Sequence, residues 1–258
     1  MNEIVQKTVT LVRSQVPLKS NYIDYQQDLR RDFWYSCAYC SVTEIEAQGI
    51  GFQIDHYLSQ ATHPDLKNHY YNLMWSCTKC NRFKGDYCPD EVKVQSGYII
   101  IRPDEDDPRN YFSLNEYELE HKNETGKFNL IKLDLNREQL RRVRELRAEL
   151  TASQNFIAFG VSELLSLSLD SITKNHRAVF KSQLDKLRDT HEQLTNSIEE
   201  LIKGLAQSNL LDEDLNKPER MKQRREYLSD IDALTPDYKI QKARQRKASN
   251  RQKRSNEK

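Results

Sequence analysis

The sequence lacks any apolar run long enough to cross a membrane. No stretch of about 18 consecutive apolar side chains occurs among its 258 residues. Residues 1–16 carry scattered charges and lack the apolar core of about 7–15 residues that a secretory signal peptide needs. We therefore expect a cytoplasmic protein that does not interact with membranes.

A nucleotide-binding glycine loop and an even set of cysteines are also missing. No Gly-x-x-x-x-Gly-Lys-Ser/Thr stretch is present, so ATP binding through a P-loop is excluded. Five cysteines are an odd number, and four of them form two Cys-x-x-Cys pairs. This spacing favours a metal site in a reducing compartment over a disulfide framework. We expect the fifth, Cys88, to be a free thiol without a role.

The sequence has almost no excess of charge of either sign, and its formal net charge is +1. The distribution is nevertheless uneven, since residues 239–258 hold nine Lys or Arg against one acid. The rest of the chain is therefore net acidic. A basic end of this kind suggests a flexible arm that contacts nucleic acid, the alternative being a solvated tail with no partner.

Proline is missing between Pro108 and Pro218, and within this interval apolar residues recur at helical spacing. Eight positions form a heptad-like seam: Phe180, Leu184, Leu187, His191, Leu194, Ile198, Leu201 and Leu205. The seam could close an intramolecular helical hairpin, with residues 156–172 as the partner helix. The alternative is a contact between copies of the chain in a homo-oligomer.

The remaining sequence indicates an α+β protein with four regions. The regions are a helical lead-in (1–36), a metal-bearing domain (37–135), a helical domain (136–238) and a basic tail (239–258). Four residues at helical spacing are expected to pack the lead-in onto the metal-bearing domain: Tyr22, Tyr25, Leu29 and Phe33. Residues 94–133 are expected to form short strands, including one at Tyr98–Ile101, with a turn at Glu124–Lys127.

The paired cysteines predict a structural Zn²⁺ site. The four ligands are Cys37, Cys40, Cys77 and Cys80. Two intervening residues let one turn present both thiolates of a pair to a tetrahedral ion. The 36 residues between Cys40 and Cys77 exceed the loop of an ordinary zinc ribbon. A further structure must therefore be built inside the loop.

That loop contains candidates for a second, different metal site. Apolar Phe52 and Ile54 alternate with a polar residue, which predicts a half-buried strand ending near Asp55 and His56. Asn81 follows the last cysteine directly, so a bound zinc ion would fix its position. Carboxylate and amide oxygens suit Mg²⁺, and an imidazole can take a proton from water.

The full pattern resembles the HNH endonuclease family, which has a ββα-metal fold. The shared elements are Cys-x-x-Cys, Asp-His, a mid-loop Asn and Cys-x-x-Cys-Asn-x-x-Lys-Gly, within residues 37–86. The resemblance implies that His56 is the general base and that Asp55 and Asn81 hold Mg²⁺ or Mn²⁺. It also implies that Asn72 ties down the loop that bears the base.

One departure from the family pattern bears on the metal. The last signature position is Asn81 rather than His, and an oxygen ligand shifts the preference toward Mg²⁺ or Mn²⁺. Lys84 and Arg82 lie within the same motif and are candidates for phosphate contacts with nucleic acid. The implied activity is metal-dependent cleavage of phosphodiester bonds, with DNA as the expected substrate.

The segments Asp107–Arg109 and Leu133–Arg137 are similar to the continuation found in HNH proteins of bacterial defence systems, including Septu and retron-associated effectors. The similarity implies an effector of antiphage defence or restriction that works with an ATPase partner. Two other functions remain open. The chain could be a zinc-stabilised binding or adaptor module without catalysis, or its helical half could serve as an assembly scaffold.

Overall fold

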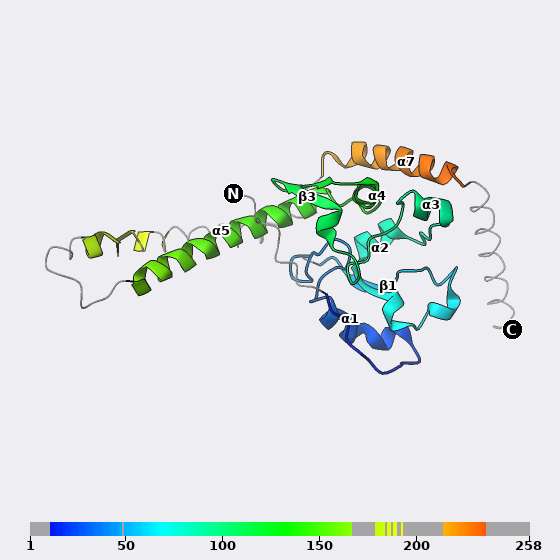
Figure 1. Cartoon of the computed structure of the whole chain (residues 1–258), viewed down its shortest axis with the longest axis horizontal. Helices are drawn as coiled ribbons and strands as arrows, with labels where there is room; N and C mark the ends of the chain where they lie inside the picture. Colours follow the sequence, from blue (N-terminus) through cyan, green and yellow to red (C-terminus); the bar gives the residue numbers. More distant parts are fainter. Residues whose placement is uncertain are drawn as a thin grey trace. The chain divides into compact units, whose positions relative to one another are not determined.

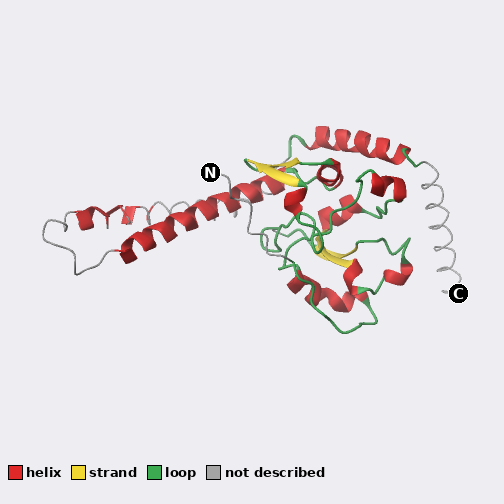
Figure 2. Cartoon of the chain, in the orientation of Figure 1, coloured by secondary structure: helices red, strands yellow, loops and turns green. Residues whose placement is uncertain are grey.

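A computed structural model describes most of the chain and is shown in Figures 1 and 2. The described residues are 11–47, 49–166, 179–183, 185–186, 188–189, 192 and 214–235, with no side chains described for 153–166. The chain divides into two compact units. The first consists of Met1–Leu140 together with Asp214–Lys258, and the second consists of Arg141–Glu213.

The centre of the first unit is a two-stranded sheet followed by a helix. Strand β1 (Phe52–His56) pairs antiparallel with β2 (Leu73–Cys77), and α2 (Thr78–Lys84) follows β2 directly. The strand expected before Asp55 and His56 is confirmed, and both residues lie at its end. The chain therefore forms a β–β–α unit, with α2 contacting both strands.

The lead-in helix packs as its spacing predicts. It consists of a 3₁₀ turn (Tyr22–Tyr25) and α1 (Gln26–Asp32), and α1 contacts β2. Seven side chains make a continuous buried core: Tyr25, Leu29, Phe33, Tyr70, Leu73, Met74 and Trp75. Removing their apolar surface from water stabilises the contact between α1 and the sheet.

The segment after α2 is more helical than its sequence suggests. Its elements are α3 (Glu91–Gln95), a hairpin of β3 (Phe112–Asn115) and β4 (Glu118–His121), and α4 (Glu124–Lys132). The expected turn at Glu124–Lys127 is wrong, because these residues form the first turns of α4. The helix begins there because the Asn123 side chain caps it by accepting a hydrogen bond from the Gly126 N–H.

The strand expected at Tyr98–Ile101 is also wrong, because these residues form no ladder. Their main-chain groups are instead paired with side chains. The Asn129 amide accepts from the Ile101 N–H at 3.0 Å and donates to the Ile99 carbonyl at 2.7 Å. The hydroxyl of Tyr57 donates to the Ile100 carbonyl at 2.6 Å. A buried backbone needs partners, and here tertiary contacts supply them.

Two longer helices complete the described structure. Helix α5 (Glu138–Ser166) begins in the first unit, and α7 (Lys217–Ala233) belongs to it. Helix α7 lies within the helical region predicted for residues 136–238, and it contacts α4 of the first unit. No helix among the described residues is long and apolar enough to cross a membrane.

Several sequence predictions fall outside what the structure describes. Of the heptad-like seam only Phe180 is described, and the remaining seven positions lie outside the described residues. For the expected partner helix at 156–172, the structure describes only the backbone of 156–166. The basic tail at 239–258 also lies outside. The helical hairpin, the homo-oligomer and the basic arm therefore stay predictions.

Candidate metal centre and active site

The four paired cysteines converge on one point. Their sulfur atoms all lie within 4.8 Å of one another, and those of Cys40 and Cys77 are 3.9 Å apart. A tetrahedral Zn²⁺ with Zn–S bonds of about 2.3 Å requires sulfur pairs about 3.8 Å apart. The cluster therefore fits a four-thiolate zinc ion in both ligand type and spacing.

Local hydrogen bonds hold the two cysteine turns against the sheet. The first turn closes through a bond from the Cys37 N–H to the Val42 carbonyl at 2.8 Å. The next residue, Ala38, donates to the carbonyl of Trp75 in β2, also at 2.8 Å. The second turn is the start of α2, where the Cys77 sulfur accepts from the Cys80 N–H. Both ligand pairs are thus attached to β2.

The cysteines differ in acidity because they share a buried site. Burial raises the pKa of the Cys37 thiol well above its ordinary value. Hydrogen bonds from Cys37 and from the other two thiols lower the pKa of Cys40 well below it. Metal binding requires the cysteine ligands to lose their protons.

Asp55 is a buried carboxylate held by two side chains from different elements. Lys84, at the end of α2, places its ammonium 3.2 Å from Oδ1 and 3.1 Å from Oδ2. The hydroxyl of Tyr39, from the first cysteine turn, donates to Oδ2. Burial raises the pKa of Asp55, while Lys84 and Tyr39 oppose that shift. The carboxylate is therefore fixed in orientation by the first cysteine turn and by α2.

His56 is held in one orientation by the loop that follows it. Its Nε2 lies 2.9 Å from the carbonyl of Lys67. A carbonyl only accepts hydrogen bonds, so Nε2 carries the proton and the neutral ring keeps its lone pair on Nδ1. Burial lowers the pKa of His56, although the bond to Lys67 opposes the shift. The imidazole is therefore neutral near pH 7 and suited to accept a proton.

Asn72 closes the loop that carries the Lys67 carbonyl. Its side chain accepts from the Leu58 N–H at 2.9 Å and donates to the Leu58 and Leu66 carbonyls at 3.0 and 3.3 Å. Asn72 itself is only 4% exposed. Asn72 therefore acts on His56 indirectly, by fixing the loop whose carbonyl orients the ring.

Asn81 lies in α2, directly after a cysteine of the cluster and three residues before Lys84. Residues three apart share a helix face, so Asn81 lies on the side of α2 from which Lys84 reaches Asp55. Among the described residues its side-chain amide has no hydrogen-bond partner. Its carbonyl oxygen is therefore available to a metal, and Asp55 and Asn81 supply hard oxygen donors of the type that Mg²⁺ takes.

The two candidate phosphate-binding residues occupy different environments. Arg82 is exposed on α2. Lys84 is only 1% exposed, and besides Asp55 its ammonium contacts the His56 carbonyl at 2.7 Å. Lys84 therefore binds Asp55 and the main chain of His56 in the protein interior, and not a phosphate at the surface. Arg82 is exposed and can reach a phosphate.

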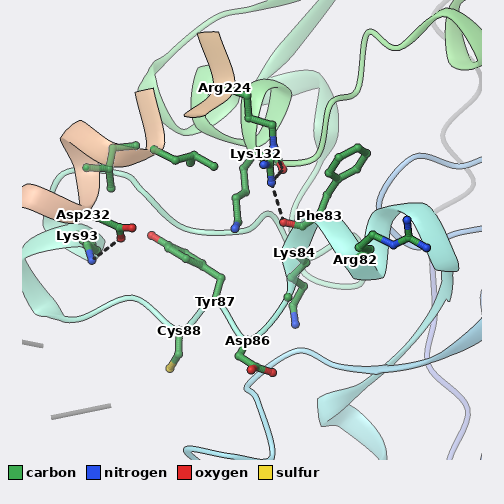
Figure 3. Close-up of a pocket in the computed structure, with 13 residues that line it drawn as sticks. Arg82, Phe83, Lys84, Asp86, Tyr87, Cys88, Lys93, Lys132, Arg224 and Asp232 are labelled. Atoms are coloured by element: carbon green, nitrogen blue, oxygen red, sulfur yellow. Dashed lines mark hydrogen bonds and ion pairs between the residues drawn. The ribbon is translucent and has the colours of Figure 1, made fainter. Parts of the chain in front are cut away.

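Helix α7 supports the far end of α2 and lines a cavity of about 370 Å³ beside it (Figure 3). The guanidinium of Arg224 donates to the carbonyls of Phe83 and Lys132 at 3.1 and 2.9 Å. These carbonyls lie at the ends of α2 and α4, where backbone acceptors lack partners within the helix. A residue late in the chain thus fixes the helix that carries Asn81 and Lys84.

The chain is similar in part to a known protein. Over 100 residues the chain is 32% identical to the Septu protein PtuB of Bacillus thuringiensis. The matched part is 39% of this chain and 36% of that protein. The chain thus spans about a third of its relative's length. No family model matches the chain.

Two contributors to the site were missed from the sequence. Tyr39 lies inside the first Cys-x-x-Cys pair, where only the cysteines were assigned a role. Its position between Cys37 and Cys40 could have indicated a role, because an ion bound by these cysteines would fix the tyrosine as it would fix Asn81. The Lys67 carbonyl is a main-chain group, and no residue type in the sequence could have indicated it.

Proposed function

We propose that the chain is a metal-dependent endonuclease of the HNH type, with Zn²⁺ as a structural ion and Mg²⁺ or Mn²⁺ at the catalytic site. The observation that carries the proposal is the state of His56. A neutral imidazole is held through Nε2 by the Lys67 carbonyl, directly after the buried Asp55 in the sequence. A structural zinc module alone has no need of such a group.

The protein groups divide the reaction between them. His56 accepts a proton from the attacking water at Nδ1, and Asn72 keeps the supporting loop in place. Asp55 and Asn81 would hold the catalytic metal, and a bound metal would supply a Lewis acid at the scissile phosphate and stabilise charge on the leaving oxygen. The products would carry 5′-phosphate and 3′-hydroxyl ends.

Tyr39 and Lys84 act on the metal ligand and not on the substrate. Together they set the orientation of the Asp55 carboxylate, which a hard cation requires because Mg²⁺ demands near-ideal geometry. Tyr39 comes from a cysteine turn and Lys84 from the helix that the second cysteine pair starts. Zinc binding would therefore fix both partners of Asp55 and organise the catalytic site without contacting it.

We further propose that the nuclease works in antiphage defence, with DNA as substrate and an ATPase as partner protein. The support is the 32% identity to a Septu protein over 100 residues, combined with the motif. Exposed Arg82, and beyond the described residues the basic tail at 239–258, would contribute phosphate contacts.

The test is cleavage of supercoiled plasmid by zinc-loaded protein. Nicked or linear product should form with Mg²⁺ or Mn²⁺ and disappear when EDTA is added, with single-stranded DNA and RNA assayed in parallel. The zinc content must be measured after EDTA treatment, so that loss of the structural ion is not mistaken for loss of the catalytic one. Binding of nucleic acid without cleavage under any of these metals would favour a non-catalytic zinc module instead.

A further inference from the structure

Arg137 is a buried cation that touches the cysteine cluster. It directly precedes α5 and is only 5% exposed. One of its terminal amino groups, Nη2, contacts three of the four sulfur atoms: Cys80 at 3.5 Å, Cys40 at 3.7 Å and Cys77 at 3.9 Å. These distances match N–H···S hydrogen bonds, which are longer than bonds to oxygen because sulfur is larger.

The other contacts of the Arg137 guanidinium hold it in place but do not balance its charge. Its Nη1 donates to the carbonyls of Leu133 and Asp134 at 3.2 and 3.1 Å. Its Nε has no hydrogen-bond partner among the described residues. The nearby carboxylate of Asp134 is paired with Arg220 at 3.0 Å and not with Arg137. Within the described structure, the only candidate negative charge in contact with Arg137 is the cysteine cluster itself.

Burying an unpaired cation is costly, and the cysteine sulfurs are the described groups placed to balance the charge of Arg137. Four neutral thiols carry none. Four thiolates around Zn²⁺ carry a net charge of about −2, since each ligand must be deprotonated to bind. A guanidinium bridging three of these sulfurs offsets about half of that charge, and its rigid fork suits several acceptors at once.

We propose that Arg137 is a charge partner of the zinc–cysteine centre that strengthens zinc binding and lowers the reactivity of the bound thiolates. Its effect on affinity comes from stabilising the deprotonated ligands. Its effect on reactivity comes from N–H···S bonds, which withdraw electron density from the sulfurs. The ion pair between Arg220 and Asp134 helps to fix the segment that carries Arg137. The inference rests on zinc as the resident ion, and is independent of nuclease activity.

The test compares wild-type protein with Arg137→Met and Arg137→Lys. Zinc affinity is measured by competition with a chromophoric chelator, and thiolate reactivity by the rate of alkylation with iodoacetamide. Arg137→Met should bind zinc about 10–100-fold more weakly, the range typical for loss of a group that supports metal ligands. Its thiolates should also be alkylated faster. Arg137→Lys keeps the positive charge but lacks the planar guanidinium. Its zinc affinity and alkylation rate should therefore fall between those of the wild type and Arg137→Met.

Arg13→Met is the matched control, because the side chain of Arg13 is also only 5% exposed and also donates to main-chain carbonyls, those of Tyr70 and Leu73. It should lose stability without changing zinc affinity or alkylation rate. Should Arg137→Met not fold, Co²⁺-substituted Arg137→Lys replaces it, with a shifted thiolate-to-metal charge-transfer band expected. Wild-type affinity and reactivity in both folded Arg137 variants would overturn the proposal. A wild-type protein that binds no zinc would instead overturn the zinc assignment itself.

Discussion

Replacing Lys84 by methionine tests how the candidate catalytic carboxylate is held. Methionine keeps most of the side-chain volume and removes the ammonium that lies 3.1 and 3.2 Å from the two Asp55 oxygens. Both side chains are almost fully buried, at 1% and 6% exposure. After the substitution Asp55 retains one donor, Tyr39, and faces a low-dielectric interior without a cation.

Breaking a buried ion pair by removing one partner costs about 3–5 kcal/mol, because the remaining charge is left uncompensated. We expect a loss of that size near pH 8. Lys93→Met provides the matched control, since Lys93 is also buried. Its ammonium lies farther from its acids, 3.7 Å from Asp90 and 3.6 Å from Asp232, and the latter is 37% exposed. The control should lose about 1 kcal/mol or less.

The loss should depend on pH in a defined direction. Burial raises the pKa of Asp55, so between its unfolded value and its folded value the native state binds more protons than the unfolded state. Stability therefore falls as pH rises through that window. Removing Lys84 raises the folded pKa further and extends the window upward. The deficit of Lys84→Met against wild type should be larger at pH 8 than at pH 5, because Asp55 of the variant takes up its proton at a higher pH than Asp55 of the wild type.

Urea unfolding followed by tryptophan fluorescence measures this difference. The chain has two tryptophans, Trp34 and Trp75, and both lie in the first unit, so the signal reports on the unit that contains the pair. Lys84→Met and Lys93→Met are compared with wild type at pH 5 and pH 8. A Lys84→Met protein as stable as wild type at both values would refute the claim that this ion pair holds Asp55.

Three further predictions address separate parts of the account. Cys77→Ser should lose zinc and soluble yield, whereas Cys88→Ser should lose neither; metal analysis finding no zinc in folded wild-type protein would contradict this. Asn72→Ala removes three side-chain hydrogen bonds. It should lower the free energy of unfolding by about 3 kcal/mol, at about 1 kcal/mol per bond, and slow cleavage; an unchanged urea midpoint would contradict it. Deleting residues 239–258 should weaken nucleic-acid binding and flatten its salt dependence; an unchanged salt slope would show that the tail is only solvated.

Short-range patterns explain which features the sequence could predict. The cysteine pairs are local, since two residues between ligands already determine that one ion can bind both. The core side chains of α1 follow from helical spacing within one segment. The end of β1 followed from alternation over a few residues. In each case the deciding interaction lies within a few positions along the chain.

The features that the sequence did not predict depend on interactions between residues far apart in the chain. Tyr98–Ile101 has the composition of a strand, but the amide of Asn129 takes over two of its main-chain bonds. The sequence predicts that Lys84 contacts phosphate, yet its ammonium binds Asp55, which lies 29 residues away in the sequence. Arg137 lies 97 residues from Cys40, and its contact with the cluster has no local signature. Such pairings emerge only once the fold brings the elements together.

The most direct test of the proposed active site is the cleavage rate of His56→Ala at saturating Mg²⁺, with fold and zinc content measured on the same sample. Loss of a general base alone typically reduces the rate on the order of 10²–10⁴-fold. The variant should keep its circular dichroism spectrum, its zinc and its affinity for nucleic acid. In the wild type, cleavage should rise with pH and level off below the ordinary histidine range, because burial lowers the pKa of His56. A folded, zinc-loaded His56→Ala protein that cleaves at the wild-type rate would contradict the assignment of this site.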